Sequence, residues 1–468
     1  MLVNCETERT AVSHAEQNHR FRAPAGKAGS SAASPKAGAS TGCPVARPEL
    51  SRRSFIGCLG AASAAAALAC TGCGSSQEEP DGGNLVTSAL PSATDAPASS
   101  AAGSGTPTSG QAGRVSFCAV GDNLANDRTL EIAEIWGGAG SGDGVYDFSP
   151  LYREISPVVS VYDIAFVNQE TVLGGNDEWD WSGYPSYNTP DSMAQALVDA
   201  GFDVVSSNTN HTYDYWTSPI EHMQQLWRGY PDIAFIGSYS SEADRAQVRV
   251  VERNGVKIAF LSYSYGQNGY EQDALPNDYY AVPWDATAFA QDYERAHAAA
   301  DAVVVYMHGG DEYTSAPNDW QREVAQTCAD AGVDLVIGSH AHVIQSFERV
   351  PRTNGDKPPM PCAYGLGDFV SSYTDYPETV LSGMFSCDFV LGDDGAVSVE
   401  NLAWTPLVEY WTYSEDGTPD DYVRLVGNLT ADEAAADYLL SSLGSDALAW
   451  LQQHTNEVLA DSGIEIRD

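Results

Sequence analysis

The sequence predicts an α/β fold, and three observations support this class. Apolar runs rich in β-branched residues, such as DAVVVYMHGG at 301–310, have the composition of buried parallel strands. Stretches with helical periodicity, such as DWQREVAQTCADAG at 319–332, alternate with these runs along the chain. The 468 residues are 43% hydrophobic and 19% charged, which is typical of a globular protein with an ample core.

The expected elements follow one another in a regular order. Strands are predicted over 114–123, 163–170, 202–211, 256–266, 301–310 and 333–342. Helices are predicted over 191–201, 284–300 and 319–332.

Two further patterns complete the folded region. The alternating run 384–404 contains a Gly-Asp-Asp-Gly turn, which predicts a β-hairpin. The run 429–444 has Thr430 and Glu433 at the spacing of a capping box, which predicts a helix that covers the sheet.

The amino-terminal region, residues 1–73, has the pattern of an export signal. Arg52 and Arg53 directly precede an Ala-rich apolar run that is too short for an ordinary membrane-spanning helix, as in twin-arginine signals. Cys73 follows this run and is the expected site of lipidation, with Cys70 as the alternative. A redox or zinc pair is the other interpretation of these two cysteines, but no second pair supports it. Because many residues precede the arginines, either the signal is extended or the true start lies downstream of Met1.

Residues 74–113 are mainly Gly, Ser, Ala, Pro and Thr, a composition that predicts a disordered linker. The folded domain is expected over 114–410, with a helical extension over 411–468 that packs on it. Four cysteines in these regions are expected to be buried free thiols, although one disulfide is the alternative. They are Cys118, Cys328, Cys362 and Cys387.

The charge is strongly asymmetric. Residues 1–73 carry a net charge of +4 and the remainder carries −45, within a total of −41. So acidic a domain repels nucleic acid and anionic membrane surfaces, and we expect no nucleic-acid partner.

Polar side chains gather directly after the carboxyl ends of the predicted strands, the edge at which α/β sheets form their sites. The chain has nine histidines, and four of them occur at these positions. The residues concerned are Asp122, Glu170, Asn210, His211, His308, His340 and His342. Carboxylate, amide and imidazole groups form a mixed oxygen and nitrogen ligand set, which suits Mn, Fe or Zn. The sequence therefore predicts a divalent metal site, whereas isolated histidines would more often be ordinary surface or core residues.

Seven blocks in a fixed order resemble the bacterial poly-gamma-glutamate capsule synthesis family of the CapA type, a branch of the calcineurin-like metallophosphoesterases. They are AVGDN, NQET, YPSYNTP, TNHTYDYW, HGGDEY, GVDLVIGSHAHVIQ and YGLGDF, between about Val115 and Val370. The resemblance implies a four-layer α/β/β/α sandwich and two divalent metal ions.

The resemblance also implies a role for each matched position. Asp122 and His342 would bind the first metal, and Glu170 would bridge the two. The second metal would be held by Asn210, His308 and His340. His211 would be the general acid that protonates a leaving group, with Asp214 orienting it, while a hydrogen-bonding role for His211 and a turn role for Asp214 are the alternatives.

Some positions depart from the family pattern. Leu124 stands where metallophosphoesterases usually place a histidine ligand, which implies a weaker first metal site. Asn126 and Asp368 also replace the residues that many relatives carry, and Asp368 is either an extra anionic contact or a loop residue. Glu312 and Tyr313 are expected to contact substrate or support the ligands, with simple packing as the alternative.

Two functions follow from this resemblance. The first is an exported hydrolase or transferase that acts on a phosphoester, or on an amide or ester of an envelope polymer such as poly-gamma-glutamate. The second is a noncatalytic lipoprotein that assists assembly or export of an anionic capsule polymer. In both, the protein is anchored to the outer face of the cytoplasmic membrane and a capsule synthesis or export complex is an expected partner.

Overall fold

The computed structural model describes residues 112–138, 145–176, 178–273, 275–353, 355, 357–373, 376–415 and 417–468. The expected export signal, Cys70, Cys73 and nearly all of the expected linker lie outside these residues. Crossing a membrane would require a longer and more apolar helix than any that the described residues form.

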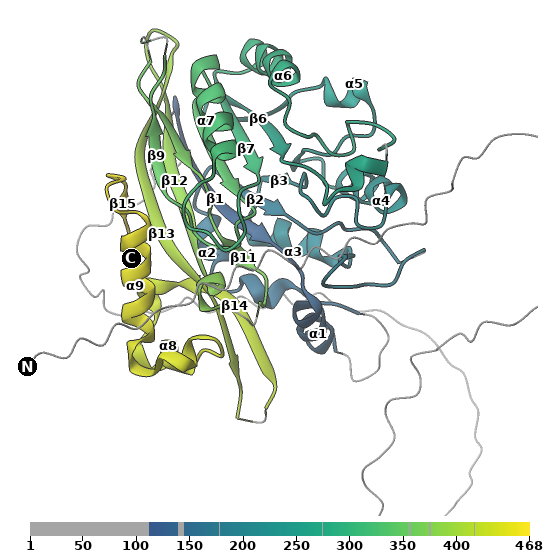
Figure 1. Ribbon diagram of the computed structural model, residues 1–468, viewed down its shortest axis with the longest axis vertical. Helices are drawn as coiled ribbons and strands as arrows, with labels where there is room; N and C mark the ends of the chain where they lie inside the picture. Colours follow the sequence, from purple (N-terminus) through teal and green to yellow (C-terminus); the bar gives the residue numbers. More distant parts are fainter. Residues whose placement is uncertain are drawn as a thin grey trace, which may run out of the picture. The chain divides into compact units, whose positions relative to one another are not determined.

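Two β-sheets form the centre of the folded region (Figure 1). The first sheet has nine strands in the order β14-β13-β12-β1-β2-β3-β4, with β11 paired to β1 and β15 paired to β13. Its strands are β1 (Arg114–Asn123), β2 (Ile164–Gln169), β3 (Val204–Ser206), β4 (Ala234–Ile236), β11 (Asp368–Val370), β12 (Leu381–Leu391), β13 (Val397–Tyr413), β14 (Pro419–Leu425) and β15 (Glu465–Ile466). Strands β1 to β4 are parallel. Strand β12 is antiparallel to β1 and forms with β13 the hairpin expected over 384–404, while β13 is antiparallel to β14 and parallel to β15.

The second sheet has six strands in the order β5-β6-β7-β8-β10-β9. They are β5 (Arg249–Arg253), β6 (Val256–Ser264), β7 (Ala302–His308), β8 (Leu335–Ser339), β9 (Phe347–Val350) and β10 (Met360–Ala363). The inner strands are parallel and the two edge strands are antiparallel.

The α-helices are α1 (Asp127–Trp136), α2 (Ser156–Val159), α3 (Ser192–Ala200), α4 (Thr217–Trp227), α5 (Glu242–Arg245), α6 (Ala286–Ala299), α7 (Asp319–Ala331), α8 (Ala431–Ala436) and α9 (Ala447–Val458). Helices α1, α3 and α4 cover the outer face of the first sheet, and α6 and α7 cover that of the second, whereas α8 and α9 pack on the inner face of the first sheet. Short 3-10 helices are η1 (Ser149–Tyr152), η2 (Tyr270–Asp273), η3 (Pro377–Val380), η4 (Val426–Asn428) and η5 (Leu440–Asp446).

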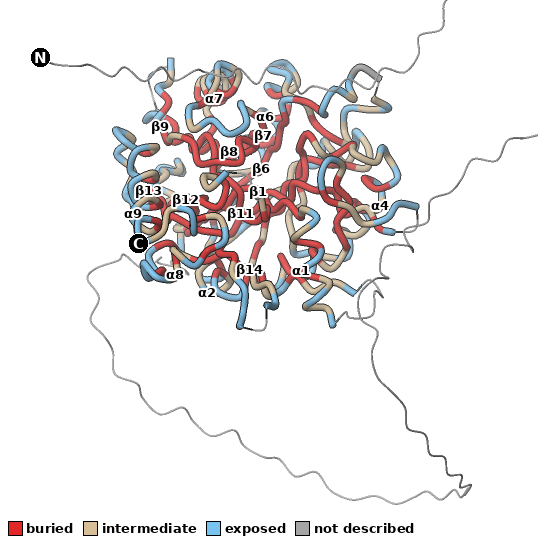
Figure 2. Tube along the Cα trace, turned by 60° about the horizontal axis from the view of Figure 1, so that its bottom comes forward, coloured by how far each residue is buried: buried red, intermediate tan, exposed pale blue. Residues whose placement is uncertain are grey.

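Alternating side chains divide the interior into three apolar layers. In β1, Phe117 and Ala119 pack between the sheets, whereas Cys118 and Val120 pack against the helices on the other face. In β7, Val304 and Tyr306 share the layer between the sheets, and the intervening residues pack against α6 and α7. Figure 2 shows the central strands β1, β6, β7 and β8 as mainly buried. The expected four-layer α/β/β/α sandwich is therefore confirmed.

The carboxyl-terminal region differs from the expected helical extension. Its expected start at residue 411 falls inside β13, and β14 and β15 extend the first sheet. The single helix expected over 429–444 is also divided. Thr430 and Glu433 form the predicted capping box of α8, but α8 ends before Asp437, whose carboxylate accepts hydrogen bonds from the N–H groups of Leu439 and Leu440.

All four cysteines of the described region are free and buried, which agrees with the free-thiol interpretation.

Candidate metal centre

Asp122 stands near the end of β1, at the point where three strands of the first sheet meet. Its register partners are Asn168 in β2 and Asp368 in β11. The Asp122 carboxylate is fully buried and accepts hydrogen bonds from Asn168 Nδ2 at 2.7 Å and from the backbone N–H of His340 at 2.9 Å. Ser339 Oγ also donates to it. One carboxylate thus joins the two sheets and has a fixed orientation.

Glu170 follows β2 directly and is also fully buried. Both of its carboxylate oxygens have no hydrogen-bond partner among the described residues. Its Oε1 lies 3.6 Å from His308 Nε2. Burial, with a further contribution from Asp122, raises the pKa of Glu170 well above its usual range. A buried carboxylate without hydrogen-bond donors is unfavourable unless a cation completes its environment.

His308 and His340 come from the ends of adjacent strands of the second sheet. His308 is the last residue of β7 and His340 follows β8, so their rings lie 4.9 Å apart between centroids. His308 Nε2 lies 2.8 Å from Asn210 Oδ1, and Tyr306 OH lies 2.9 Å from His308 Nδ1. Burial, with the neighbouring histidines adding to the effect, lowers the pKa of both histidines well below the ordinary value. Both are therefore neutral imidazoles, the form that binds metals.

His342 and Asp368 form a second pair in the centre. His342 Nδ1 lies 2.9 Å from Asp368 Oδ1, and both residues are buried. Burial alone would lower the pKa of His342, but Asp368, Glu170 and Asp122 raise it to about 10. Burial raises the pKa of Asp368 to about 6, against the opposing effect of His342.

The loop that carries His340 and His342 has an unusual backbone. The backbone angle φ is 108° at His340 and 58° at His342, values that residues other than glycine rarely adopt. Such conformations persist where surrounding contacts enforce them and are common at functional sites. Here they accompany the placement of two imidazoles, two residues apart, on either side of the shared carboxylate of Glu170.

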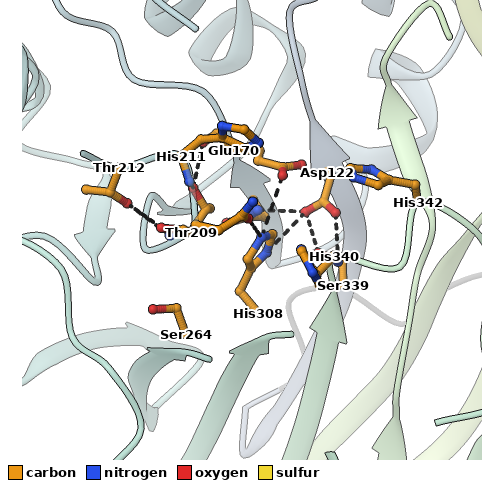
Figure 3. Close-up of polar contacts among 12 residues, drawn as sticks. Asp122, Glu170, Thr209, His211, Thr212, Ser264, His308, Ser339, His340 and His342 are labelled. Carbon is orange, nitrogen blue, oxygen red and sulfur yellow. Dashed lines mark hydrogen bonds and ion pairs between the residues drawn. The ribbon is translucent and has the colours of Figure 1, made fainter. Parts of the chain in front are cut away.

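The ligand atoms of these residues form two groups that share Glu170. Figure 3 shows Glu170 together with Asp122, His308, His340 and His342. One group contains Glu170, His308 and His340, and the other contains Asp122, Glu170, His342 and Asp368. Within each group the atoms lie within 4.8 Å of one another. Four buried atoms of these groups have no hydrogen-bond partner among the described residues, namely both Glu170 oxygens, His340 Nδ1 and Asp368 Oδ2.

This donor set fits divalent metal ions. In the described part of the chain, the ion pairs of Asp122, Glu170 and Asp368 involve histidines only. The buried negative charge therefore exceeds the positive charge that the protein supplies, and carboxylate and imidazole ligands suit divalent cations. The clustered acids and histidines thus indicate divalent metal binding.

His211 and Asp214 stand beside this cluster. His211 Nδ1 lies 2.8 Å from Asp214 Oδ2, which also accepts the backbone N–H of Tyr187 at 2.8 Å. The ring of Tyr187 contacts the His211 ring edge-on, with centroids 4.7 Å apart. Asp214 therefore holds Nδ1 of His211 and orients its ring.

The other predicted residues lie in different surroundings. Asn126 caps α1, and its Oδ1 accepts the backbone N–H groups of Asp127 and Tyr184. Glu312 is exposed, and Tyr313 is 42% exposed with its ring centroid 5.7 Å from that of His342. Leu124 is fully buried and can offer no ligand atom.

Sequence reasoning did not assign Ser339 and Tyr306 to the site. Ser339 donates to Asp122, and Tyr306 OH lies 2.6 Å from Ser339 Oγ. A weak signal was present, since Tyr306 is two residues before His308 and so shares its face of β7. Asp368, left open between a contact and a loop residue, is placed among the ligand candidates.

The two-sheet sandwich gathers carboxylate, amide and imidazole groups at the carboxyl ends of its strands. This is the kind of fold and site that the resemblance of the sequence implied.

The comparisons with known proteins then give the family. The family model described as "Bacterial capsule synthesis protein PGA_cap" matches residues 116–373, and the chain belongs to this family. It is 32% identical over 253 residues to the PGA biosynthesis protein CapA of Bacillus subtilis (strain 168), covering 54% of this chain and 62% of that protein. It is 24% identical over 243 residues to the capsule biosynthesis protein CapA of Bacillus anthracis, covering 50% and 56%. The match therefore spans less than two thirds of either relative.

The chain also matches solved structures, among them these two. The NAD nucleotidase of Haemophilus influenzae is 11% identical with a TM-score of 0.39, covering 76% of this chain and 64% of that chain. A putative 5'-nucleotidase from Staphylococcus aureus is 12% identical with a TM-score of 0.36, covering 65% and 56%.

Proposed function

We propose that this protein is an exported metal-dependent hydrolase or transferase that acts on an ester or amide bond during synthesis or processing of a capsule polymer such as poly-gamma-glutamate. Membership of the capsule synthesis family supports the polymer as the substrate class. A small phosphoester is the other substrate that the metallophosphoesterase fold suits.

The observation that carries this proposal is the position of Glu170. Its two oxygens are buried, lack hydrogen-bond partners among the described residues, and belong to both ligand groups. A purely structural carboxylate would be paired with a donor. A carboxylate shared between two sets of metal ligands instead suits a bridging role between two cations.

The residues divide the chemistry between them. Asp122, His342 and Asp368 would hold one ion, Asn210, His308 and His340 the other, and Glu170 both. Such ions, Mn, Fe or Zn, would supply a nucleophile from water and neutralise charge on the substrate oxygens. His211, held through Nδ1 by Asp214, donates a proton from Nε2 to the leaving group.

The amino-terminal sequence supports the location that we propose. The twin arginines would direct export, and a lipid on Cys73 would anchor the protein to the outer face of the cytoplasmic membrane. There it would meet the envelope polymer, and capsule synthesis or export proteins would be its partners.

The test combines metal analysis with a substrate screen. The purified chain is loaded separately with Mn, Fe and Zn and assayed against phosphomonoesters, phosphodiesters and gamma-glutamyl amides and esters. His211→Ala should retain metal while turnover falls by about 10²–10⁴-fold, the usual contribution of a positioned acid or base.

His222→Ala is the matched control. His222 also contacts a carboxylate, with Nε2 2.9 Å from Asp191 Oδ2, but that carboxylate belongs to neither ligand group. The control should keep wild-type turnover. Equal rates for wild type and His211→Ala would contradict the catalytic role. A chain that binds metal but converts none of the substrates would favour the noncatalytic lipoprotein.

A further inference from the structure

Glu409 in β13 binds the loop that follows β11. Its side chain is buried, and both carboxylate oxygens accept hydrogen bonds from two successive backbone N–H groups. The N–H of Ser371 lies 3.1 and 3.0 Å from the two oxygens, and that of Ser372 lies 3.0 and 2.9 Å from them. Consecutive N–H groups that converge on one anion form a nest, which a carboxylate fits by charge and shape.

The carboxylate stabilises a backbone conformation that serine rarely adopts. Ser372 has φ 49°, in the left-handed region. Its hydroxyl donates to Asp421 Oδ2 at 2.8 Å and lies 3.0 Å from Thr129 Oγ1. The loop is therefore held from β13, β14 and α1 together.

This loop connects two groups that contact His342. Asp368, which lies 2.9 Å from His342 Nδ1, precedes it in β11. Tyr373, whose ring centroid lies 5.2 Å from that of His342, follows it. A shift at Ser371 and Ser372 would therefore move both neighbours of His342.

Glu409 is unlike an ordinary stabilising acid. In the described part of the chain it forms no ion pair, and burial raises the pKa of its carboxyl well above the usual range. With no cation beside it among the described residues, the buried carboxylate depends on the N–H groups of Ser371 and Ser372, and these N–H groups depend on it in turn. Glu409 also lies beyond residues 116–373, which the family model matches.

We propose that Glu409 is a positioning residue that fixes Asp368 and Tyr373 against His342 by holding the Ser371–Ser372 nest. This role rests on the proposed metal centre. It means that the hairpin of β13 and β14, here called the carboxyl-terminal hairpin, helps to position the residues around His342.

The test replaces one carboxylate oxygen in the full chain. Glu409→Gln keeps the side-chain volume but turns an amide NH₂ group toward two N–H donors. Amide hydrogen exchange in the peptide containing residues 368–373 should accelerate. Mn affinity should fall by about 10–100-fold, the usual effect of losing a partner that supports a ligand.

Asp437→Asn is the matched control. Asp437 is another buried carboxylate that accepts backbone N–H bonds, from Trp411, Leu439 and Leu440, but none of these N–H groups belongs to the loop after β11. It should leave exchange at 368–373 and Mn affinity unchanged. If Glu409→Gln does not fold, Glu409→Asp keeps the charge, withdraws the carboxylate, and should shift both readouts in the same direction.

The proposal is overturned if folded Glu409→Gln exchanges its amide hydrogens at 368–373 as slowly as wild type. It is also overturned if exchange is faster but the variant binds Mn with wild-type affinity. A wild-type chain that binds no divalent metal would refute the proposed function instead. The exchange measurement, which needs no metal, would then decide separately whether Glu409 holds the loop.

Discussion

At Glu170, burial and missing hydrogen bonds together indicate a ligand. Asp122 is equally buried, but four groups donate to it or lie within hydrogen-bonding distance, so its orientation is fixed by the protein. Glu170 has no such partners among the described residues. Removing its charge should therefore affect bound cations more than the fold.

Glu170→Gln tests this expectation. The amide lacks the negative charge that offsets two cations, so Mn affinity should fall by more than about 100-fold, beyond the range typical for a supporting residue. Glu294→Gln makes the same charge change at an exposed position in α6 and should bind Mn as wild type does. Mass spectrometry after dialysis measures the metal retained per chain. Equal amounts in the two variants would contradict the role of Glu170 as a metal ligand.

Among the elements, β1 and β11 approach each other unusually closely. A Cβ atom on Gly121 would lie 1.9 Å from the backbone oxygen of Gly367. The backbone N–H of Asp122 donates to that oxygen at 3.1 Å. Glycine at 121 therefore permits the approach that sets Asp122 opposite Asp368.

Gly121→Ala should separate the two strands. We expect a loss of about 1–3 kcal/mol in the free energy of unfolding, typical of overpacking, together with weaker Mn binding. Gly392→Ala is the control, in the exposed turn between β12 and β13. The closest atom to a Cβ at this position belongs to the flexible side chain of Asp394, so the variant should behave as wild type. Urea unfolding and Mn titration provide the two readouts. If Gly121→Ala is less stable but binds Mn as wild type does, the close approach of Gly121 and Gly367 does not support the metal centre.

The hairpin of β13 and β14 contains a second buried acid, Asp421. Burial raises its pKa to about 7, with Asp437 adding to the effect and Ser372 and Arg128 opposing it. Its ordinary value is 3.8. Between these values the folded protein keeps a proton that the unfolded chain releases, so this group reduces stability as the pH rises.

Asp421→Asn removes this titration. Relative to wild type, the variant should gain stability as the pH rises from about 4 to 7, by at most about 1.4 kcal/mol per pH unit, and the difference should level off above 7. Urea unfolding of both proteins across this range measures it. A stability difference that stays constant with pH would show that Asp421 is ionised throughout.

At the scale of the whole molecule, charge and hydrophobic patterning separate the chain into a basic amino-terminal segment and an acidic body. The net charges of +4 and −45 on either side of residue 73 are consistent with an export signal followed by a domain that does not bind anionic membranes by charge. Attachment to the membrane would then depend on a lipid anchor.

Replacing Arg52 and Arg53 by Lys tests this location. Twin-arginine signals depend on the arginines themselves, so precursor should accumulate in the cytoplasm. Fractionation with immunodetection measures the distribution, and mass spectrometry of the mature protein identifies its first residue. Normal export of the double-lysine variant would contradict the signal, and an unlipidated mature protein that starts elsewhere than Cys73 would contradict the anchor.

The sequence by itself determined the α/β class, the central parallel strands, the hairpin over 384–404 and most ligand candidates. These features depend on local patterns, namely apolar β-branched runs and polar residues directly after them. The carboxyl ends of parallel strands meet at one edge, so Asp122, Glu170, His308 and His340 could be grouped before any coordinates were known.

Only the tertiary structure decided the contacts made across the sheets and from the carboxyl-terminal hairpin. Asp368 joins the ligand candidates because β11 pairs with β1, far away in sequence. Glu409 acquires its partners only when β13 folds beside the loop after β11. Neither contact follows from periodicity, because both depend on strand register between distant segments, which three-dimensional packing sets.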